Sequence, residues 1–328
     1  MTVVQPEIVE RFRADLDALV AGGARIGVAV SGGSDSLALL LLAAAARPGR
    51  VEAATIDHGL RPGAAEEATM VEQVCQRLSV PHAILAVRWS EIPETAIQER
   101  ARHQRYLLLG YWAEERGLDA IVTAHHAEDQ AETLLMRLAR GAGVRGLAAM
   151  RARSITPGAH VRLVRPLLGW RRQELEQVCA AAGLTPAADP SNLDERFERV
   201  RVRRSMAGLD WLDPGAVAQS AAHLADADAA LDWAMKEEWA RSVQERRGSI
   251  RYRRSDVPAE IVRRIVARAI RRLATEGDRD PRGAELTRLV ATLSDGGTAT
   301  LRGVLCRGGA DWDFVPSPNR TRPVDKSE

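Results

Sequence analysis

Residues 26–46 read IGVAV-SGGSDS-LALLLLAAAA, and this stretch decides the fold of the chain. Residues 26–30 form a short apolar run typical of a buried strand, and residues 37–46 form a Leu/Ala run with high helix propensity. The polar segment 31–36 is therefore predicted to turn from a strand into a helix. Such a turn presents helical N–H groups without intrahelical partners, and the positive end of the helix dipole, to an anion.

The residue types in segment 31–36 suit a pyrophosphate group. Gly32 and Gly33 allow dihedrals closed to other residues and place no Cβ between the amides and a phosphate. Three hydroxyl donors accompany them, at Ser31, Ser34 and Ser36. No lysine follows, so the segment is not a Walker A loop. We predict an ATP site; the alternative is a Gly/Ser turn that only caps the helix.

Length and composition set the broad class of the protein. The 328 residues suffice for two domains, and 45% hydrophobic with 27% charged residues is ordinary for a globular chain. The longest apolar run, residues 37–46, is too short to cross a bilayer, and we find no export signal. We therefore expect a cytoplasmic protein with no membrane partner. Three cysteines lie far apart without C-x-x-C spacing, which favours reduced buried thiols over zinc or iron–sulfur sites: Cys75, Cys179 and Cys306.

Strand and helix patterns alternate through residues 1–213, the expected first domain. Further strands are expected at 51–56, 83–87 and 120–124, helices at 66–78, 97–116 and 128–138, and another apolar segment at 161–168. Repeated units of this length predict an α/β fold with a doubly wound parallel sheet. Ligands bind beyond the carboxyl ends of such strands, so segments beginning at Ser31, Asp57 and His125 should meet at one cleft.

Beyond residue 213 the strand pattern largely disappears. Residues 216–239 and 259–273 look helical, and the second of these carries Ile261 and Ile265 on one face, with Arg264 and Arg268 on the other. We predict a boundary near Pro214 and a smaller, mainly helical domain over 214–315. Residues 296–303 are expected to begin a short β element, and residues 316–328 to form a disordered tail.

Arginine supplies almost all of the 46 basic residues, although the formal net charge is only +2. The arginines concentrate in residues 196–204 and 251–272. Because guanidinium groups bind phosphates through paired hydrogen bonds, both clusters are candidate contacts for an RNA backbone. A solvated, arginine-rich face is the alternative for the second cluster.

Two further segments follow expected strands. Residues 57–61 read DHGLR and could contact a nucleotide or simply end the strand in a turn. Residues 125–133 read HHAEDQAET, in which adjacent histidines point apart but Asp129 and Glu132 share a helical face. This carboxylate pair could bind Mg²⁺ or a cationic substrate; the alternative is an acidic first turn that complements the helix dipole.

Segment 31–36 resembles the S-G-G-x-D-S signature of the PP-loop ATP pyrophosphatases, which cleave ATP to AMP and pyrophosphate and activate a substrate oxygen as its adenylate. Further motifs resemble tRNA(Ile)-lysidine synthases in order, over roughly residues 25–204: residues 57–61, Arg102 with Arg105-Tyr106, 123–133, 140–147, 165–168 and 189–192. In that family, ATP adenylates C2 of the wobble cytidine, position 34, in the CAU anticodon of tRNA(Ile). Lysine then displaces AMP to give lysidine, and the tRNA reads AUA.

The resemblance implies a role for each matching residue, with ATP as substrate and Mg²⁺ as cofactor, for which Asp35 is the candidate ligand. Catalysis falls to Asp35, Asp129, Glu132 and Arg203, and L-lysine is bound by Asp129 and Glu132. The implied ATP ligands are Ser31, Gly32, Gly33, Ser34, Asp35, Ser36, Asp57, His58, Arg105 and His125. The implied tRNA ligands are Arg199, Arg201, Arg203, Arg264 and Arg268.

The chain departs from the family pattern at two places. The family's Arg-Asn-x-x-Arg is Arg199-Val200-Arg201-Val202-Arg203 here, and Ala96 replaces a frequent asparagine. A PP-loop tRNA thiolase is the nearest alternative, but such enzymes generally need reactive cysteines or a cluster, and none of the three cysteines here is suitably placed. A nucleotide-binding sensor without catalysis would have no need for Asp129 and Glu132. The sequence leaves the oligomeric state open, a homodimer included.

Overall fold

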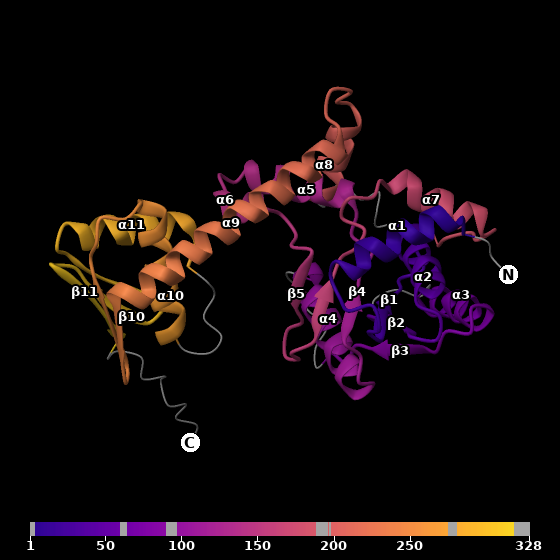
Figure 1. Ribbon diagram of the computed structural model, residues 1–328, viewed down its shortest axis with the longest axis horizontal. Coiled ribbons are helices and arrows are strands. Elements are labelled where there is room, and N and C mark those ends of the chain that lie inside the picture. Colours follow the sequence, from indigo (N-terminus) through magenta and orange to yellow (C-terminus); the bar gives the residue numbers. More distant parts are fainter. Residues whose placement is uncertain are drawn as a thin grey trace, which may run out of the picture. The chain divides into compact units, whose positions relative to one another are not determined.

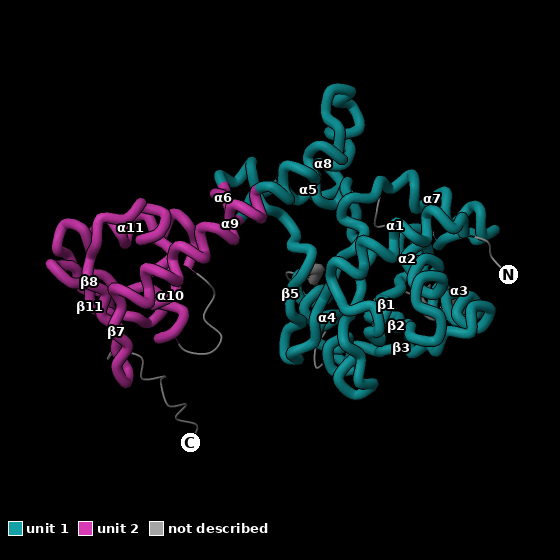
Figure 2. Tube along the Cα trace, in the orientation of Figure 1, with its two compact units in different colours: residues 1–141, 146–223 teal, residues 142–145, 224–328 magenta. Residues whose placement is uncertain are grey.

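The computed structural model describes residues 4–59, 64–89, 97–187, 196, 198–274 and 281–317. The chain divides into two compact units, which Figure 2 colours separately. Unit 1 comprises residues 1–141 and 146–223, and unit 2 comprises residues 142–145 and 224–328. Pro214, where we expected the boundary, begins helix α9 (Pro214–Ser242), and the division falls further along this helix, between His223 and Leu224.

Unit 1 is built on a six-stranded sheet with the order β3-β2-β1-β4-β6-β5 (Figure 1). Its strands are β1 (Ile26–Ala29), β2 (Val51–Asp57), β3 (His82–Ala86), β4 (Ala120–Val122), β5 (Arg153–Ile155) and β6 (Arg162–Val164). Neighbouring strands are parallel except β5, which pairs antiparallel with β6 at one edge. The predicted parallel sheet is confirmed, and the antiparallel edge strand adds to it.

Helices cover both faces of this sheet. Among the described residues, the helices that precede α9 are α1 (Pro6–Asp17), α2 (Ser34–Ala46), α3 (Ala64–Arg77), α4 (Ile97–Glu115), α5 (Ala127–Leu138), α6 (Val144–Leu147), α7 (Arg172–Ala181) and α8 (Glu198–Ala207). One core cluster joins α1, α2, α3 and α7 to the sheet, with Val28 and Val122 among its buried members. A second cluster packs Leu109 and Trp112 of α4 against Ile121. The sheet is therefore doubly wound, as predicted.

Chain order places a topological switch point between β1 and β4. From β1 the chain proceeds through β2 to β3 on one side, and then crosses to β4 on the other side of β1. Both neighbours pair with β1 in parallel, with Ile26 opposite Val51 and Ala120. In open α/β sheets, ligands bind in the crevice at this point, beyond the carboxyl ends of the strands. Segment 31–36 directly follows β1 and therefore lies there.

Unit 2 contains the helices expected there together with a five-stranded antiparallel sheet, most of which the sequence did not predict. The sheet has the order β7-β8-β11-β10-β9. Its strands are β7 (Val243–Arg246), β8 (Ser249–Arg253), β9 (Thr298–Leu301), β10 (Val304–Arg307) and β11 (Asp311–Pro316), and the helices beside α9 are α10 (Ala259–Leu273) and α11 (Gly283–Ser294). Strands β9 and β10 confirm the predicted β element. Of the expected tail, Pro316 ends β11, and residues 318–328 lie outside the described part.

The arginines of β8 explain why the strand pattern was missed. Ile250 and Tyr252 are buried, whereas the alternate positions Arg251 and Arg253 are exposed. The core of unit 2 gathers Tyr252 and Trp312 with apolar side chains of α10 and α11. A strand with only two inward apolar residues gives a weak periodic signal. Every helix among the described residues lacks the combination of length and hydrophobicity that a membrane crossing requires.

Candidate active site

Segment 31–36 forms the predicted turn between β1 and α2. Gly32 has a φ of 86°, in the left-handed region that favours glycine. The Ser36 hydroxyl donates to Gly33 O at 3.0 Å and accepts from the Ser31 amide at 3.1 Å, so this side chain closes the loop. The amide of Leu37 donates to Gly33 O at 3.0 Å. The amides at the very start of α2 precede this first helical bond and can face an anion.

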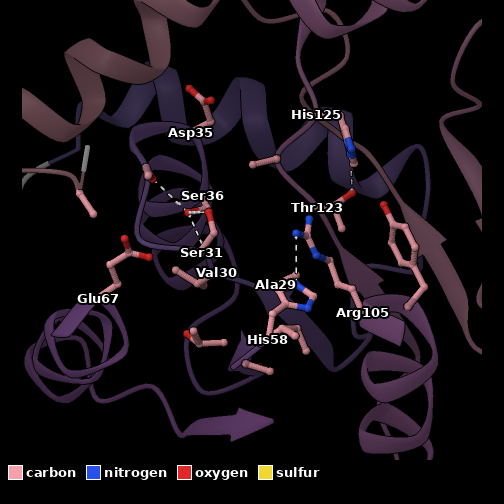
Figure 3. Close-up of a pocket in the computed structure, with 17 residues that line it drawn as sticks. Ala29, Val30, Ser31, Asp35, Ser36, His58, Glu67, Arg105, Thr123 and His125 are labelled. Atoms are coloured by element: carbon pink, nitrogen blue, oxygen red, sulfur yellow. Dashed lines mark hydrogen bonds between the residues drawn. The ribbon is translucent and has the colours of Figure 1, made fainter. Parts of the chain in front are cut away.

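A cavity of about 380 Å³ opens at the carboxyl ends of β1, β2 and β4 (Figure 3). This volume falls in the range of small-molecule sites. Seven of the ten predicted ATP ligands line it: Ser31, Gly33, Asp35, Ser36, His58, Arg105 and His125. The cleft predicted from three separate segments therefore exists. Further lining residues that sequence reasoning did not assign include Ala29, Ala54, Thr55, Ile56 and Glu67.

The other three predicted ATP ligands lie beside this cavity without lining it. Gly32 accepts a hydrogen bond from the Ala187 amide at 3.0 Å, and the Ser34 hydroxyl donates to Asp35 at 3.1 Å. Asp57 Oδ1 accepts from the Gly59 amide at 2.9 Å and so closes the turn after β2. Several motif positions lie outside the described residues: 60–61, 96 and 189–192.

His125 lies in the cavity as a neutral side chain. Its Nδ1 is 3.0 Å from Thr123 Oγ1. Burial lowers the pKa of His125 well below its ordinary value, and the charges of Arg165, Arg102, Arg199 and Arg105 lower it further. At neutral pH this imidazole can therefore donate one hydrogen bond and accept another, but it carries no charge.

Asp129 and Glu132 share one face of α5, as predicted, and that face contacts α8. Arg199 reaches Asp129 Oδ1 through Nη2 and Glu132 Oε2 through Nε, both at 2.5 Å. Arg203 Nε lies 2.6 Å from Glu132 Oε1. The Glu132 side chain is only 1% exposed. We call these four residues the α5–α8 cluster; it unites the expected lysine ligands with two of the expected tRNA ligands.

His126 connects the cavity to the α5–α8 cluster, and sequence reasoning did not assign it to the site. The ring is buried, and its Nε2 lies 3.4 Å from Asp35 Oδ2 and 3.6 Å from Asp129 Oδ2. Its Nδ1 lies 2.9 Å from Glu128 Oε2. Burial lowers the pKa of His126, but the contacts with Asp35, Glu128 and Asp129 outweigh it and raise the pKa to about 10. His126 is therefore an imidazolium at neutral pH.

The start of α5 fixes this arrangement. The backbone amide of His126 donates to Asp129 Oδ2 at 3.2 Å, as in a helix-capping box. Burial raises the pKa of Glu128, but hydrogen bonds from His126, Arg171 and the Arg172 amide lower it to about 2. The sequence signal that could have identified His126 is Asp129, the carboxylate three residues later, at the usual capping-box position.

Asp35 is held as a carboxylate by the same contacts. Burial raises its pKa, whereas the His126 imidazolium, the charge of Arg172 and the Ser34 hydroxyl lower it, and the net pKa lies below its ordinary value. The carboxylate follows the first residue of α2, where the helix dipole also favours a negative charge. Asp35 therefore remains ionised throughout the neutral range.

The remaining arginines predicted to bind tRNA differ in their surroundings. Arg201 of α8 is exposed and donates to Arg196 O at 3.1 Å. Arg268 of α10 stacks over the Trp239 ring, with 4.6 Å between Cζ and the ring centroid. Arg264 is only 5% exposed and bonds Asp228, Asp232 and Glu260. The expected exposure of Arg264 is therefore wrong, and its burial argues against contact with tRNA.

The three cysteines are buried thiols, as predicted. Burial raises the pKa of Cys75 and of Cys306 to about 12, and burial together with the charge of Asp35 raises that of Cys179 to about 11. Thiols with such pKa values are weak nucleophiles at neutral pH. This finding argues against the tRNA thiolase alternative.

Comparison with known proteins extends this description. The family model of the PP-loop domain matches residues 5–208. Over 311 residues the chain is 50% identical to the tRNA(Ile)-lysidine synthase of Novosphingobium aromaticivorans, covering 94% of this chain and 93% of that protein. The chain belongs to the tRNA(Ile)-lysidine synthase family. It is also 41% identical over 302 residues to the tRNA(Ile)-lysidine synthase of Zymomonas mobilis, covering 92% of this chain and 91% of that protein.

A solved structure supports the fold of this family member. The U34-tRNA thiolase of Methanococcus maripaludis matches with a TM-score of 0.55 at 18% sequence identity, covering 66% of this chain and 76% of that one. At this identity the likeness speaks for the PP-loop fold alone. The resemblance to the lysidine synthase family that the motifs indicated is thus confirmed by relatives that match along most of the chain.

Proposed function

We propose that this protein uses ATP to join L-lysine to C2 of the cytidine at position 34 in the CAU anticodon of tRNA(Ile). The products are lysidine, AMP and pyrophosphate, and the modified tRNA reads AUA. The relatives' names support the reaction class, and the geometry of the site supports the roles that we propose for its residues. Because its proposed substrate is a tRNA, we place the reaction in the cytoplasm.

One contact carries this proposal. Asp35, at the edge of the cavity, and Asp129, in the α5–α8 cluster, both lie within 3.6 Å of His126 Nε2. A nucleotide in the cavity and an amine at the acidic pair would thus be bound on two sides of one buried imidazolium. Two reactants held this close can react within one site, which is what a ligase requires.

In the proposed first step, the C2 carbonyl oxygen of cytidine attacks the α-phosphorus of ATP. A new P–O bond forms, the bond to the β-phosphate oxygen breaks, and pyrophosphate leaves. Gly33, Ser34 and the amides that begin α2 suit the charge that develops on pyrophosphate. The cavity lining of Ala29, Ala54 and Ile56 offers an apolar surface for adenine.

In the proposed second step, the neutral ε-amine of lysine attacks C2 of the adenylated cytidine. A C–N bond forms, the C–O bond breaks, AMP leaves with the electron pair, and the attacking nitrogen loses one proton to solvent. AMP is a far better leaving group than the original oxygen, which is why adenylation comes first. Asp129 and Glu132 would orient the lysine through the positive charge of its α-ammonium group, and Arg203 would face the phosphate of the departing AMP.

Mg²⁺ fits the donor set around Asp35. Mg²⁺ in nucleotide sites is bound by one or two carboxylates together with substrate phosphates, rather than by a cage of protein ligands. Asp35 is partly exposed, with a side chain 31% accessible, and it stays ionised at neutral pH. When bound there, Mg²⁺ would supply neutralisation of charge on the phosphates. The protein residues hold and orient the reactants around it.

Incubation of the purified protein with labelled L-lysine, Mg-ATP and a tRNA(Ile) transcript bearing CAU tests the proposal. We expect lysine to enter the RNA, and no incorporation when uridine replaces cytidine at position 34. The matched control is a tRNA(Met) transcript, which also bears CAU and shows whether other parts of the tRNA are read. No incorporation into tRNA(Ile), while a characterised synthase works under the same conditions, would refute the proposal.

A further inference from the structure

The α5–α8 cluster poses a problem for the proposed function. Arg199 and Arg203 occupy the carboxylates that we assign to substrate lysine, through three ion pairs of 2.5 to 2.6 Å. The same two arginines are proposed ligands of RNA. In this arrangement Glu132, at 1% exposure, has guanidinium nitrogens against both of its carboxylate oxygens. A lysine ammonium therefore cannot reach Glu132 unless a guanidinium moves.

Charge pairing explains why the arginines are there. A buried carboxylate without a cation is strongly destabilising, so Glu132 needs a positive partner whether or not lysine is bound. Arg199 and Arg203 are four residues apart and therefore project from the same face of α8. Arg199 bridges the two carboxylates by contacting both Asp129 and Glu132. Helix α8 thus supplies the positive charge that lysine would supply during the reaction.

A displaced guanidinium also needs a partner. Phosphate groups suit it well, because the planar fork of arginine binds phosphate through two parallel hydrogen bonds. Helix α8 further carries Arg201 and Arg204, both exposed, so its accessible side is basic. An RNA backbone brings phosphates to such a helix from solvent. Exchange of partners would leave each buried charge paired before and after.

We propose that Arg199 and Arg203 are placeholders for substrate lysine: they neutralise Asp129 and Glu132 until lysine enters, and a guanidinium that lysine displaces then binds a phosphate of the RNA. The inference rests on the proposed function, since it takes lysine and RNA as the two ligands. Lysine and RNA then bind cooperatively, because each favours the arrangement that the other requires. By linkage, each raises the affinity of the other by the same factor.

Equilibrium binding of labelled L-lysine to the full chain, with and without the tRNA(Ile) transcript and without ATP, tests the exchange. For the wild-type protein we expect RNA to tighten lysine binding about tenfold, a usual size for coupling between two sites. In Arg199→Met, lysine should bind about tenfold more tightly than to wild type when RNA is absent, and RNA should add little. Arg199→Lys keeps the charge without the fork and should lie between them.

Arg140→Met is the matched control. Arg140 pairs with Glu198 and so joins α5 to α8 outside the cluster. Its loss should leave lysine affinity unchanged. This control shows whether a gain in lysine affinity comes from carboxylates that have lost their arginine or from a weaker contact between α5 and α8. RNA binding by Arg199→Met should also lose about one unit of salt dependence, a readout that a purely structural role would not move.

Two results would overturn the exchange: equal lysine affinity of the wild-type protein with and without RNA, or lysine binding by Arg199→Met no tighter than wild type. An Arg140→Met variant that reproduces the gain would overturn it as well. Circular dichroism shows whether Arg199→Met is folded. If it is misfolded, lysine binding by Arg199→Lys, with and without RNA, replaces it as the test. Lysine incorporation by the wild-type protein is measured first. Its absence overturns the proposed function and the exchange together, whereas incorporation without coupling overturns the exchange alone.

Discussion

His126 Nε2 lies 3.4 Å from Asp35 Oδ2, so a buried imidazolium at the start of α5 holds the carboxylate at the start of α2. The two helices follow β4 and β1, which are neighbours in the sheet. The contact therefore spans the switch point of the fold. The contact holds Asp35 at the edge of the cavity, and the same imidazole also faces Asp129.

Replacement of His126 by glutamine should make the free energy of unfolding less dependent on pH in the neutral to alkaline range. The pKa of His126 is about 10 in the folded protein and about 6.5 when unfolded. Its contribution to the free energy of unfolding is thus fully present below about pH 6.5 and is lost as pH rises through about 10. The difference between wild type and His126→Gln, from denaturant titrations without Mg²⁺, should fall by a few kcal/mol over this window. A difference independent of pH would contradict the imidazolium.

Asp35→Asn should abolish turnover while the fold stays intact. The change keeps the size of the side chain but removes the negative charge that faces His126 and any bound Mg²⁺. We expect kcat for lysine incorporation to fall at least about 100-fold. Steady-state kinetics measure the loss, and thermal unfolding checks the fold. Activity close to that of wild type would show that Asp35 has been assigned wrongly.

The site could be predicted from sequence where a motif coincides with a strand end. The turn at 31–36 and the cavity follow from a strand–turn–helix pattern, because parallel strands bring their carboxyl ends together. His126 was missed because its importance depends on three carboxylates around one ring, and Asp35 lies 91 residues away along the chain. Sequence spacing reports neighbours along one helix, not contacts between helices.

The same limit explains the errors in unit 2. The spacing of α10 correctly placed Ile261 and Ile265 in the core, but it placed Arg264 on a solvated face. Arg264 lies instead against Asp228 and Asp232 of α9, and its burial depends on those partners. Helical periodicity cannot distinguish an exposed arginine from one whose charge is matched by another helix.

Arg264→Met should destabilise unit 2 far more than Arg263→Met. Arg264 is 5% exposed, and its loss would leave the buried carboxylate of Asp228 with poor compensation, at a cost of about 3–5 kcal/mol. Within the described part of the chain, Arg263 pairs with the more exposed Glu260, and that pair should contribute below about 1 kcal/mol. Denaturant unfolding of both variants measures the difference. Equal effects would contradict a buried network around Arg264.

Gly27→Ala should destabilise unit 1, whereas Gly23→Ala should not. A Cβ on Gly27 would lie 2.5 Å from Cζ3 of Trp112, so α4 could no longer pack against β1. Overpacking of this kind costs about 1–3 kcal/mol. A Cβ on Gly23 meets nothing within 4 Å. Thermal unfolding of the two variants provides the measurement, and an unchanged midpoint for Gly27→Ala would contradict the close packing.

The most direct test of the central claim is the nucleoside composition of the product. After reaction of the wild-type protein with tRNA(Ile), lysine and Mg-ATP, the RNA is digested and its nucleosides are identified by mass spectrometry. We predict lysidine in place of the cytidine at position 34, with one AMP and one pyrophosphate released for each lysidine formed. Unmodified cytidine at that position, or lysidine formed without release of AMP, would contradict the account.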